Sequence, residues 1–370
     1  MGTPDARTAF YYTRSPGFGY NGTTTAIVTT DLSPPSLLAR LPKAELHLHL
    51  ETSLRLRRLL ERGERDPSPL GHPHLIADPA LFAGYDRLRR LRYASRAGRI
   101  ADAAYSRANI SAITAELIRE VAAQTIRHVE IRVGGRRGFE ALGVRAMLEA
   151  MAEGADAGQS DGLTYGFIVT AVRERGPDDA ERLVADVVAC RDCGVVGVDL
   201  AGDEENYPPA MFAAAIGRAR DAGLGITVHA GEFAGPAGVW AAVYQLGAQR
   251  IGHGIRAVED PALLERLRDR GVTLELCPTS NVRLGLVPAM VAHPVRTLMG
   301  SGVPVTINSD DPLLLGTSLT RELALVSRAH HLDPNHVVGL MVNAAQAAFL
   351  PDDAREALTK EIRSALLPAG

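Results

Sequence analysis

Cysteine is scarce in this sequence, and long apolar runs are missing. The three cysteines, Cys190, Cys193 and Cys277, are too few for a disulfide framework, which favours a protein of the reducing cytoplasm. No run reaches the roughly 18 apolar residues that a membrane span requires. The N-terminus also lacks a basic segment followed by an apolar one. We therefore expect neither membrane insertion nor a secretory signal.

A strong charge of one sign is also lacking. The 370 residues carry a net charge of -3, and the short basic stretches are not interleaved with aromatic residues. This pattern argues against a nucleic-acid partner. With 46% hydrophobic and 22% charged residues, the composition is typical of a globular protein with a large core.

From residue 36 onward, short apolar runs alternate with amphipathic stretches. Nearly apolar strands separated by single helices are typical of buried parallel strands with right-handed crossovers. Eight such units predict an α/β fold, a closed (β/α)8 TIM barrel. The predicted strands are residues 44–49, 128–133, 165–172, 195–201, 225–230, 250–254, 273–277 and 304–308. The predicted helices between them are residues 141–157, 177–193, 208–222, 239–246, 261–270 and 294–301.

Three segments fall outside this regular alternation. Residues 1–34 are rich in Gly, Thr, Ser and Pro without periodicity, and we expect a poorly ordered extension before a single barrel domain over residues 35–370. The first crossover, residues 54–127, is long and carries two or three helical patterns, so it is expected to form a helical lid over the catalytic mouth. The tail, residues 319–367, predicts extra helices packed outside the barrel.

His47 and His49 stand two residues apart in the first predicted strand. Side chains at positions i and i+2 of a strand share a face, so both imidazoles point the same way and together invite a metal. An isolated pair of this kind is more often a pair of solvated histidines. Further acid and base residues after other predicted strands favour the metal.

Polar clusters follow five of the predicted strands. Because catalytic residues of such barrels lie at the carboxyl ends of the strands, these clusters are expected to converge. They comprise His47 and His49 at the first strand, Asp203 and Glu204 after the fourth, His229 and Glu232 at the fifth, His253 at the sixth, and Asp310 and Asp311 after the eighth. Residues 276–281 after the seventh strand form a polar turn without an obvious acid or base.

His47, His49, His229 and Asp310 would form a nitrogen-rich set with one carboxylate. Such a set suits one zinc ion with room for a water, although the same ligands also bind iron or cobalt. Zinc lowers the pKa of its water to about 7, which supplies hydroxide at neutral pH.

The remaining clusters offer acids and bases beside that set. Glu232 is a candidate proton donor or shuttle, and His253 could orient the hydroxide or stabilise developing charge. Asp310 and Asp311 are consecutive carboxylates, so one could hold metal while the other faces the substrate. Taken singly, His253 could be a satisfied core histidine and the two aspartates a helix-capping turn.

Two other groups receive a structural interpretation. Asp203 and Glu204 are interpreted as solvated loop carboxylates. Cys190 and Cys193 fall at the end of a helical pattern and follow Ala189 rather than the proline of a Pro-Cys-x-x-Cys deaminase signature, so helix packing explains them better.

Five segments in this order resemble the adenosine deaminase family of the amidohydrolase superfamily: residues 41–51, 229–232, 251–254, 277–281 and 308–312. The resemblance covers about residues 40 to 350. It implies a (β/α)8 barrel with one zinc that hydrolyses the exocyclic amine of an adenine ring and releases ammonia. It also implies a small-molecule purine as the partner.

The resemblance also implies roles for individual residues. Zinc would be bound by His47, His49, His229 and Asp310, with the attacking hydroxide held by Asp310 and His253. Glu232 would protonate the purine N1. The substrate would be contacted by His49, by Glu51, by the backbone N–H of Gly202 at N3 and by Asp311 at N7.

One departure from the family concerns the substrate. Glu51 is followed by Thr52 where the family usually has Gly, beside the position that helps nucleoside-specific members recognise the ribose. We expect adenosine or 2'-deoxyadenosine as substrate, giving inosine or 2'-deoxyinosine. Adenine or a 5'-extended adenosine such as aminodeoxyfutalosine is the alternative.

Two alternatives change the class of protein. One is a non-catalytic homologue that binds purines, although such a protein would have no chemical need for Glu232 or His253. The other is a metal hydrolase acting on a lactam or phosphoester. Many of those use two metals bridged by a lysine or glutamate after the fourth strand, whereas Ala201 and Gly202 stand there in this chain. A homo-oligomer is compatible with the sequence, which does not give the oligomeric state.

Overall fold

The computed structural model describes residues 37–50, 105–134 and 136–366. The predicted N-terminal extension lies outside these residues. So does most of the predicted lid, of which only the part from Tyr105 onward is described.

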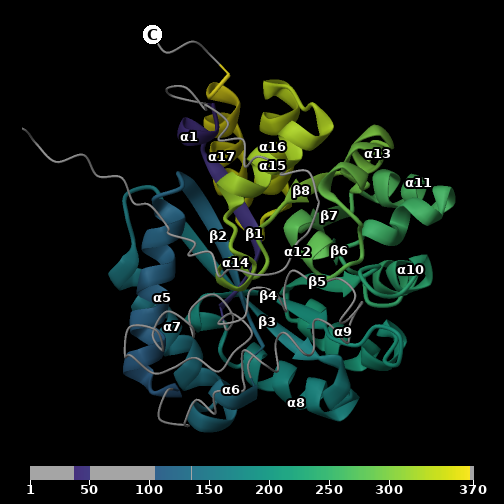
Figure 1. Ribbon diagram of the computed structural model, residues 1–370. Helices are drawn as coiled ribbons and strands as arrows, with labels where there is room; N and C mark the ends of the chain where they lie inside the picture. Colours follow the sequence, from purple (N-terminus) through teal and green to yellow (C-terminus); the bar gives the residue numbers. More distant parts are fainter. Residues whose placement is uncertain (1–36, 51–104, 135, 367–370) are drawn as a thin grey trace, which may run out of the picture. The chain divides into compact units, whose positions relative to one another are not determined.

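Eight parallel strands form one sheet whose spatial order follows the sequence from β1 to β8 (Figure 1). The predicted α/β barrel is confirmed, and each predicted strand lies within two residues of its observed bounds. The strands are β1 (Lys43–His49), β2 (Ile126–Val133), β3 (Thr164–Val172), β4 (Val195–Ala201), β5 (Gly225–Ala230), β6 (Arg250–His253), β7 (Thr273–Leu276) and β8 (Val305–Ile307).

The last strand meets the first through the residues that follow β8. Asp310 N–H donates to the carbonyl of His47 at 2.9 Å, and His49 N–H donates to the carbonyl of Asp310 at 2.8 Å. These bonds make a short parallel bridge between Leu48 and Asp310. Asp310 is thereby held beside His47 and His49, although more than 250 residues separate them in the sequence.

Helices fill the crossovers and the tail. They are α1 (Leu37–Arg40), α5 (Arg107–Ala122), α6 (Arg136–Leu142), α7 (Val144–Gly158), α8 (Pro177–Val188), α9 (Ala213–Asp221), α10 (Pro236–Tyr244), α11 (Pro261–Arg270), α12 (Pro278–Arg283), α13 (Val295–Gly300), α14 (Pro312–Leu315), α15 (Leu319–His330), α16 (Pro334–Ala347) and α17 (Asp352–Ser364). The predicted tail helices are confirmed, and α16 packs against β1 and β8 outside the barrel.

Four sequence predictions about helices and turns need correction. The segment after β7 is not a polar turn but begins helix α12, with Pro278 at the first helical position, where its missing N–H costs nothing. The helix predicted over residues 177–193 ends at Val188 and continues only as a 3₁₀ turn, Arg191–Cys193, before Gly194 in the left-handed region.

The helix predicted over residues 208–222 begins as a 3₁₀ turn, Pro209–Phe212, and is α-helical only in α9. The helix predicted over residues 141–157 spans the break at Gly143 between α6 and α7. The predicted helices over residues 239–246, 261–270 and 294–301 overlap α10, α11 and α13.

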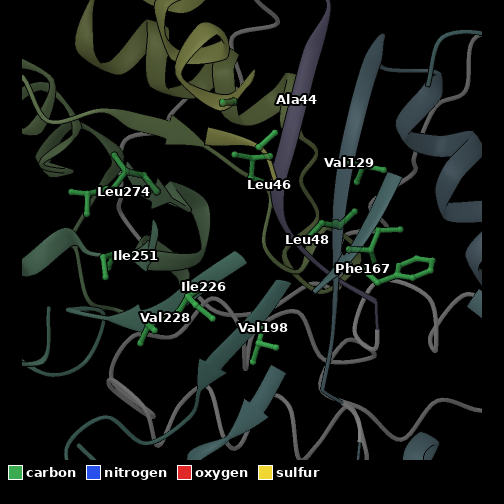
Figure 2. Packing of buried hydrophobic residues seen from close by; sticks show 14 of the residues in the cluster. Ala44, Leu46, Leu48, Val129, Phe167, Val198, Ile226, Val228, Ile251 and Leu274 are labelled. Atoms are coloured by element: carbon green, nitrogen blue, oxygen red, sulfur yellow. The ribbon is translucent and has the colours of Figure 1, made fainter. Parts of the chain in front are cut away.

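The strands divide their side chains between two faces. Leu46 and Leu48 of β1 are almost wholly buried and belong to the hydrophobic cluster that also includes Ile226, Val228 and Leu274 from other strands (Figure 2). Because faces alternate along a strand, His47 and His49 point the other way, into the barrel. None of the described helices combines the length and apolar character needed to span a bilayer.

Candidate metal centre and active site

Three histidines meet at the carboxyl end of the barrel. His47 and His49 come from β1 and His229 from β5, and one ring nitrogen of each lies within 4.8 Å of the others. All three side chains are buried, and the ring centroids of His47 and His229 are 4.6 Å apart. The structure therefore brings together the three histidines that the sequence analysis selected as metal ligands.

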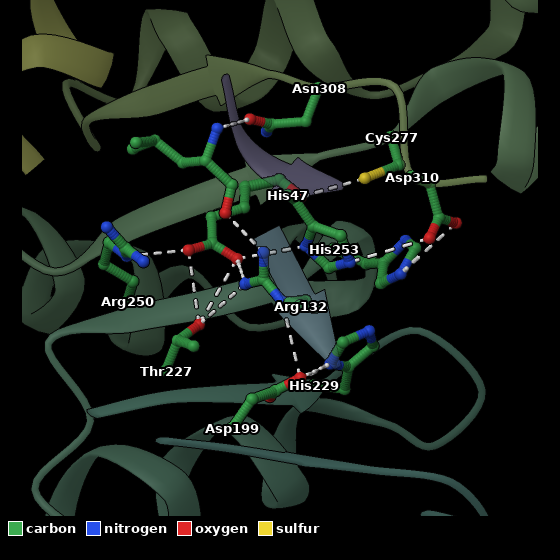
Figure 3. A network of polar contacts seen from close by, with 12 residues as sticks. His47, Arg132, Asp199, Thr227, His229, Arg250, His253, Cys277, Asn308 and Asp310 are labelled. Atoms are coloured by element: carbon green, nitrogen blue, oxygen red, sulfur yellow. Dashed lines mark hydrogen bonds and ion pairs between the residues drawn. The ribbon is translucent and has the colours of Figure 1, made fainter. Parts of the chain in front are cut away.

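Buried carboxylates orient two of these rings (Figure 3). Nδ1 of His47 lies 3.0 Å from Oε2 of Glu275, and Nδ1 of His229 lies 3.1 Å from Oδ1 of Asp199. A carboxylate accepts a hydrogen bond, so each Nδ1 carries the proton and each Nε2 keeps its lone pair for the cluster. Burial, with the nearby Arg132 charge, holds the pKa of His47 well below its usual range. His47 is thus a neutral imidazole, as a metal ligand must be.

Two buried polar atoms in the cluster have no hydrogen-bond partner among the described residues. They are Nε2 of His229 and Oδ1 of Asp310. That Asp310 oxygen lies 3.4 Å from Nε2 of His49 and 3.7 Å from Nε2 of His47. Leaving such atoms buried and unpaired is costly, and a cation among them would satisfy both the imidazole lone pairs and the carboxylate. The residues present fit a metal ion.

Glu232 and His253 flank this donor set. Nε2 of His253 lies 3.6 Å from Oε1 of Glu232 and 4.0 Å from Oδ2 of Asp310. Both residues are at least 97% buried, with relative exposures of 3% and 1%. The acid and base groups predicted for the chemistry therefore adjoin the proposed metal ligands.

Two of these residues have unusual backbone conformations. His253 and Asp310 each have a φ of 61°, in the left-handed region that non-glycine residues rarely adopt. Asp310 is fixed there by its two backbone bonds to β1. Such strain is typical of functional sites, where the surrounding structure holds it in place.

Of the residues predicted to contact the substrate, Gly202 and Asp311 are described and follow strands β4 and β8 at the carboxyl end of the barrel. Gly202 follows β4 with a φ of 124°, and a Cβ added there would come within 2.1 Å of Oε2 of Glu174, so glycine is required. Asp311 is 1% exposed and precedes α14, where its side chain makes no capping hydrogen bond. Glu51 and Thr52 lie outside the described residues.

The interpretation of Glu204 as a solvated carboxylate is wrong. Its side chain is buried and accepts hydrogen bonds from three consecutive backbone N–H groups, those of Gly231 at 2.8 Å, Glu232 at 3.1 Å and Phe233 at 3.3 Å. Glu204 therefore fixes the turn that carries Glu232. In the sequence, Glu204 is followed by the polar residues Glu205 and Asn206 and so resembles part of a solvated loop.

Sequence reasoning also missed the carboxylates that orient the histidines. Asp199 and Glu275 are single acids within apolar strands, each fully buried, and both contact the fully buried guanidinium of Arg132 on β2 (Figure 3). The sequence did hold one indication of such a carboxylate, namely a single acid at an inward-facing position of a predicted barrel strand. It needs a buried partner, and here the partners are a histidine and an arginine.

Cys277 borders the site, because its sulfur and one ring nitrogen each of His47 and His253 lie within 4.8 Å of one another. Cys277 is buried with its thiol 3.6 Å from the carbonyl of Glu275, and burial raises the pKa of the thiol well above its usual range, which leaves it unreactive. Cys190 and Cys193 lie in the hydrophobic core, in agreement with a packing role.

An eight-stranded parallel barrel with a buried cluster of histidines and carboxylates at the carboxyl ends of its strands has the architecture of the amidohydrolases, with a group of histidines that could hold a metal. Within that class, the family model described as adenosine deaminase matches residues 42–365. The chain belongs to the adenosine deaminase family. It is accordingly an aminohydrolase that acts by hydrolytic deamination.

Relatives with different substrates resemble this chain to similar degrees. It is 41% identical to an adenine deaminase of Chelativorans sp. strain BNC1, over 60% of this chain and 69% of that protein. It is 35% identical to an aminodeoxyfutalosine deaminase of Streptomyces avermitilis, over 93% of this chain and 96% of that protein. It is 32% identical to an adenosine deaminase of Serratia proteamaculans, over 88% of this chain and 99% of that protein.

Solved structures agree with the barrel. The adenine deaminase of Arthrobacter aurescens superposes with a TM-score of 0.76 at 26% identity, covering 88% of this chain and 98% of that one. An amidohydrolase of Burkholderia ambifaria with bound zinc gives a TM-score of 0.75 at 25% identity, covering 89% and 92%.

Proposed function

We propose that this protein uses one zinc ion per subunit, held by His47, His49, His229 and Asp310, to deaminate an adenine-containing small molecule. The observation that supports it most is the buried donor set, in which His229 Nε2 and Asp310 Oδ1 have no hydrogen-bond partner among the described residues. The zinc in the Burkholderia ambifaria relative supports the choice of metal. Zinc at such a site lowers the pKa of a bound water to about 7 and so supplies a nucleophile at neutral pH.

The chain's own residues then manage protons and orientation. Glu232 gives a proton to N1 of the purine, which makes C6 electrophilic. His253 and Asp310 position the attacking water between them, consistent with the 4.0 Å that separates Nε2 of His253 from Oδ2 of Asp310. The N–H of Gly202 and the carboxyl of Asp311 hold the base at N3 and N7. The role proposed for Glu51 is recognition of the sugar.

For the substrate we propose adenosine or 2'-deoxyadenosine, which yields inosine or 2'-deoxyinosine and ammonia. The second candidate is adenine or a 5'-extended adenosine. The relatives named adenine deaminase and aminodeoxyfutalosine deaminase favour it, because they match this chain at 41% and 35% identity. Thr52 in place of the usual glycine is a further reason to keep it. We also propose a cytoplasmic location and a single domain over residues 35–370.

The test is kcat/KM for ammonia release by zinc-loaded protein on adenosine, 2'-deoxyadenosine, adenine and aminodeoxyfutalosine. A preference of at least tenfold for the two nucleosides would support the first candidate. Turnover confined to adenine or the extended nucleoside would overturn that substrate and support the second. No turnover on any of the four would overturn the proposed function in favour of a purine-binding protein.

A further inference from the structure

Two buried side chains, those of Asn281 and His293, extend from His253 as a chain of hydrogen bonds. Asn281, on α12, lies with Nδ2 3.2 Å from Nδ1 of His253, and its Oδ1 lies 3.1 Å from Nε2 of His293. His293 stands between α12 and α13 and is 3% exposed, while Asn281 is fully buried. None of the catalytic roles described above uses either residue.

The direction of each hydrogen bond in this chain follows from its far end. The backbone N–H of Val295 points at Nδ1 of His293, at 3.2 Å. A backbone N–H can only donate, so Nδ1 of His293 must be the acceptor. A neutral imidazole that accepts at one nitrogen carries its proton on the other, so Nε2 of His293 is the donor.

That His293 is neutral follows from its surroundings. Burial, with a smaller contribution from His330, lowers the pKa of His293 to about 3. At neutral pH the ring therefore has one proton only, and the backbone bond places it on Nε2.

The amide of Asn281 transmits this constraint. Because Nε2 of His293 donates, the Asn281 atom facing it must be the oxygen. The amide nitrogen then faces His253 and donates to its Nδ1. His253 accepts at Nδ1, so in the neutral ring its proton sits on Nε2.

The other side of His253 agrees with this tautomer. Its Nε2 lies 3.6 Å from Oε1 of Glu232 and 4.0 Å from Oδ2 of Asp310. An N–H directed at two carboxylates is favourable, whereas a lone pair directed at them would be repelled. A proton on Nε2, as the bonds through Asn281 require, is therefore compatible with this side of the ring as well.

We propose that His293 is a positioning residue that acts through Asn281 to fix the Nε2–H tautomer of His253. His253 then serves the reaction as a hydrogen-bond donor to the oxygen that adds to the purine, and it does not take a proton from it. This inference rests on the proposed function for the role of His253. The tautomer itself can be observed without any substrate.

The experiment uses the zinc-loaded full chain labelled with [¹⁵N]histidine. Ring nitrogens with and without a proton have well-separated ¹⁵N shifts, and the His253 signals are those lost in His253→Gln. We expect a protonated Nε2 and a bare Nδ1 in the wild type. The opposite pattern in the wild type would overturn the proposal.

Asn281→Asp provides the sharpest variant. A carboxylate accepts from both histidines, so the proton of His253 should move to Nδ1. Zinc content should not change, because neither Asn281 nor His253 is a proposed zinc ligand. A wrong tautomer cost another histidine-dependent enzyme about 10⁴-fold in kcat, so we expect a loss of roughly 10³-fold or more here. An unchanged tautomer would contradict the relay.

His293 offers a conservative pair and a control in case Asn281→Asp fails to fold. His293→Gln keeps a donor for the Asn281 oxygen and should retain most of kcat, whereas His293→Leu removes it and should lose at least tenfold more. His330→Gln is the matched control, because the His330 ring bonds the backbone carbonyl of Met290 and takes no part in the hydrogen bonds through Asn281. Equal kcat values for the Gln and Leu variants would overturn the proposal. A correct tautomer in an enzyme inactive on all purines would instead refute the proposed function.

Discussion

Asp199 on β4 accepts a hydrogen bond of 3.1 Å from Nδ1 of His229 on β5. Its other oxygen lies 3.4 Å from Nε of Arg132, whose guanidinium also pairs with Glu275, the carboxylate that orients His47. One buried arginine thus joins the two carboxylates, on β4 and β7, that orient two of the proposed metal ligands. Figure 3 shows Arg132 beside Asp199, and Asp199 beside His229.

Replacing Asp199 by Asn should weaken zinc binding. The amide can still accept from His229 but lacks the charge that makes the imidazole a better ligand, and loss of such a partner typically costs 10–100-fold in affinity. Competition with a zinc chelator measures the change. Asp192→Asn, at a carboxylate paired with Arg145 on the surface, is the matched control and should leave the affinity unchanged. Equal affinities in the two variants would show that Asp199 does not tune the site.

Glu232→Gln separates metal binding from proton transfer. The amide cannot protonate N1 of the purine, so kcat should fall by roughly 10²–10⁴-fold, the usual contribution of a general acid. Zinc content by elemental analysis should stay at the wild-type value. Near-normal turnover in this variant would remove Glu232 from the mechanism.

Glu204→Gln should disturb the turn that carries Glu232. A glutamine offers one acceptor oxygen where the carboxylate offers two, so at least one of three buried N–H groups loses its partner, at a cost of about 1–3 kcal/mol. We expect a lower free energy of unfolding in urea and a lower kcat with little change in KM. Asp203→Asn is the control, because the Asp203 carboxylate accepts from Glu205 and Asn206 of its own loop and not from the turn that carries Glu232. The same loss of kcat in both variants would contradict a specific role for Glu204.

The buried neutral His293 should make stability depend on pH. Its pKa is lowered to about 3 in the folded protein, against about 6.5 in an unfolded chain. Between these values the unfolded state binds a proton that the folded state does not. The free energy of unfolding should therefore fall as the pH drops below about 6.5, by up to about 1.4 kcal/mol per pH unit.

Urea titrations from pH 7.5 to 4.5 test this, with His293→Gln as the comparison. The variant has no group to titrate at this position, so its stability should decline less steeply than that of the wild type by the slope of one proton. Parallel curves would mean that His293 takes up its proton in the folded protein as readily as in the unfolded one.

The fold was predictable because it depends on local patterns. Apolar strands alternating with single amphipathic segments determine a parallel barrel, and the expected strand ends of β4 and β5 coincide with the observed ones. Catalytic residues of such barrels lie at the carboxyl ends of the strands, which placed His47, His229 and Asp310 at one rim without knowledge of any contact.

The supporting shell could not be predicted in the same way. Asp199, Glu275 and Arg132 lie on three strands with no common spacing, and only the closed barrel brings them into contact. His293 and Asn281 are twelve residues apart across a helix end, and the backbone N–H of Val295 gives their hydrogen bonds a direction. Such information lies in tertiary geometry and not in the sequence pattern.

The central claim is that one zinc, held by the cluster of His47, His49, His229 and Asp310, is required for deamination. The most direct measurement adds zinc stepwise to metal-free protein and records the rate of ammonia release from the best substrate at each ratio. Activity should rise in proportion to zinc and stop rising at one equivalent per chain, and His229→Ala should show no such rise in the same range. Full activity in the metal-free protein, or a break at two equivalents, would contradict this claim.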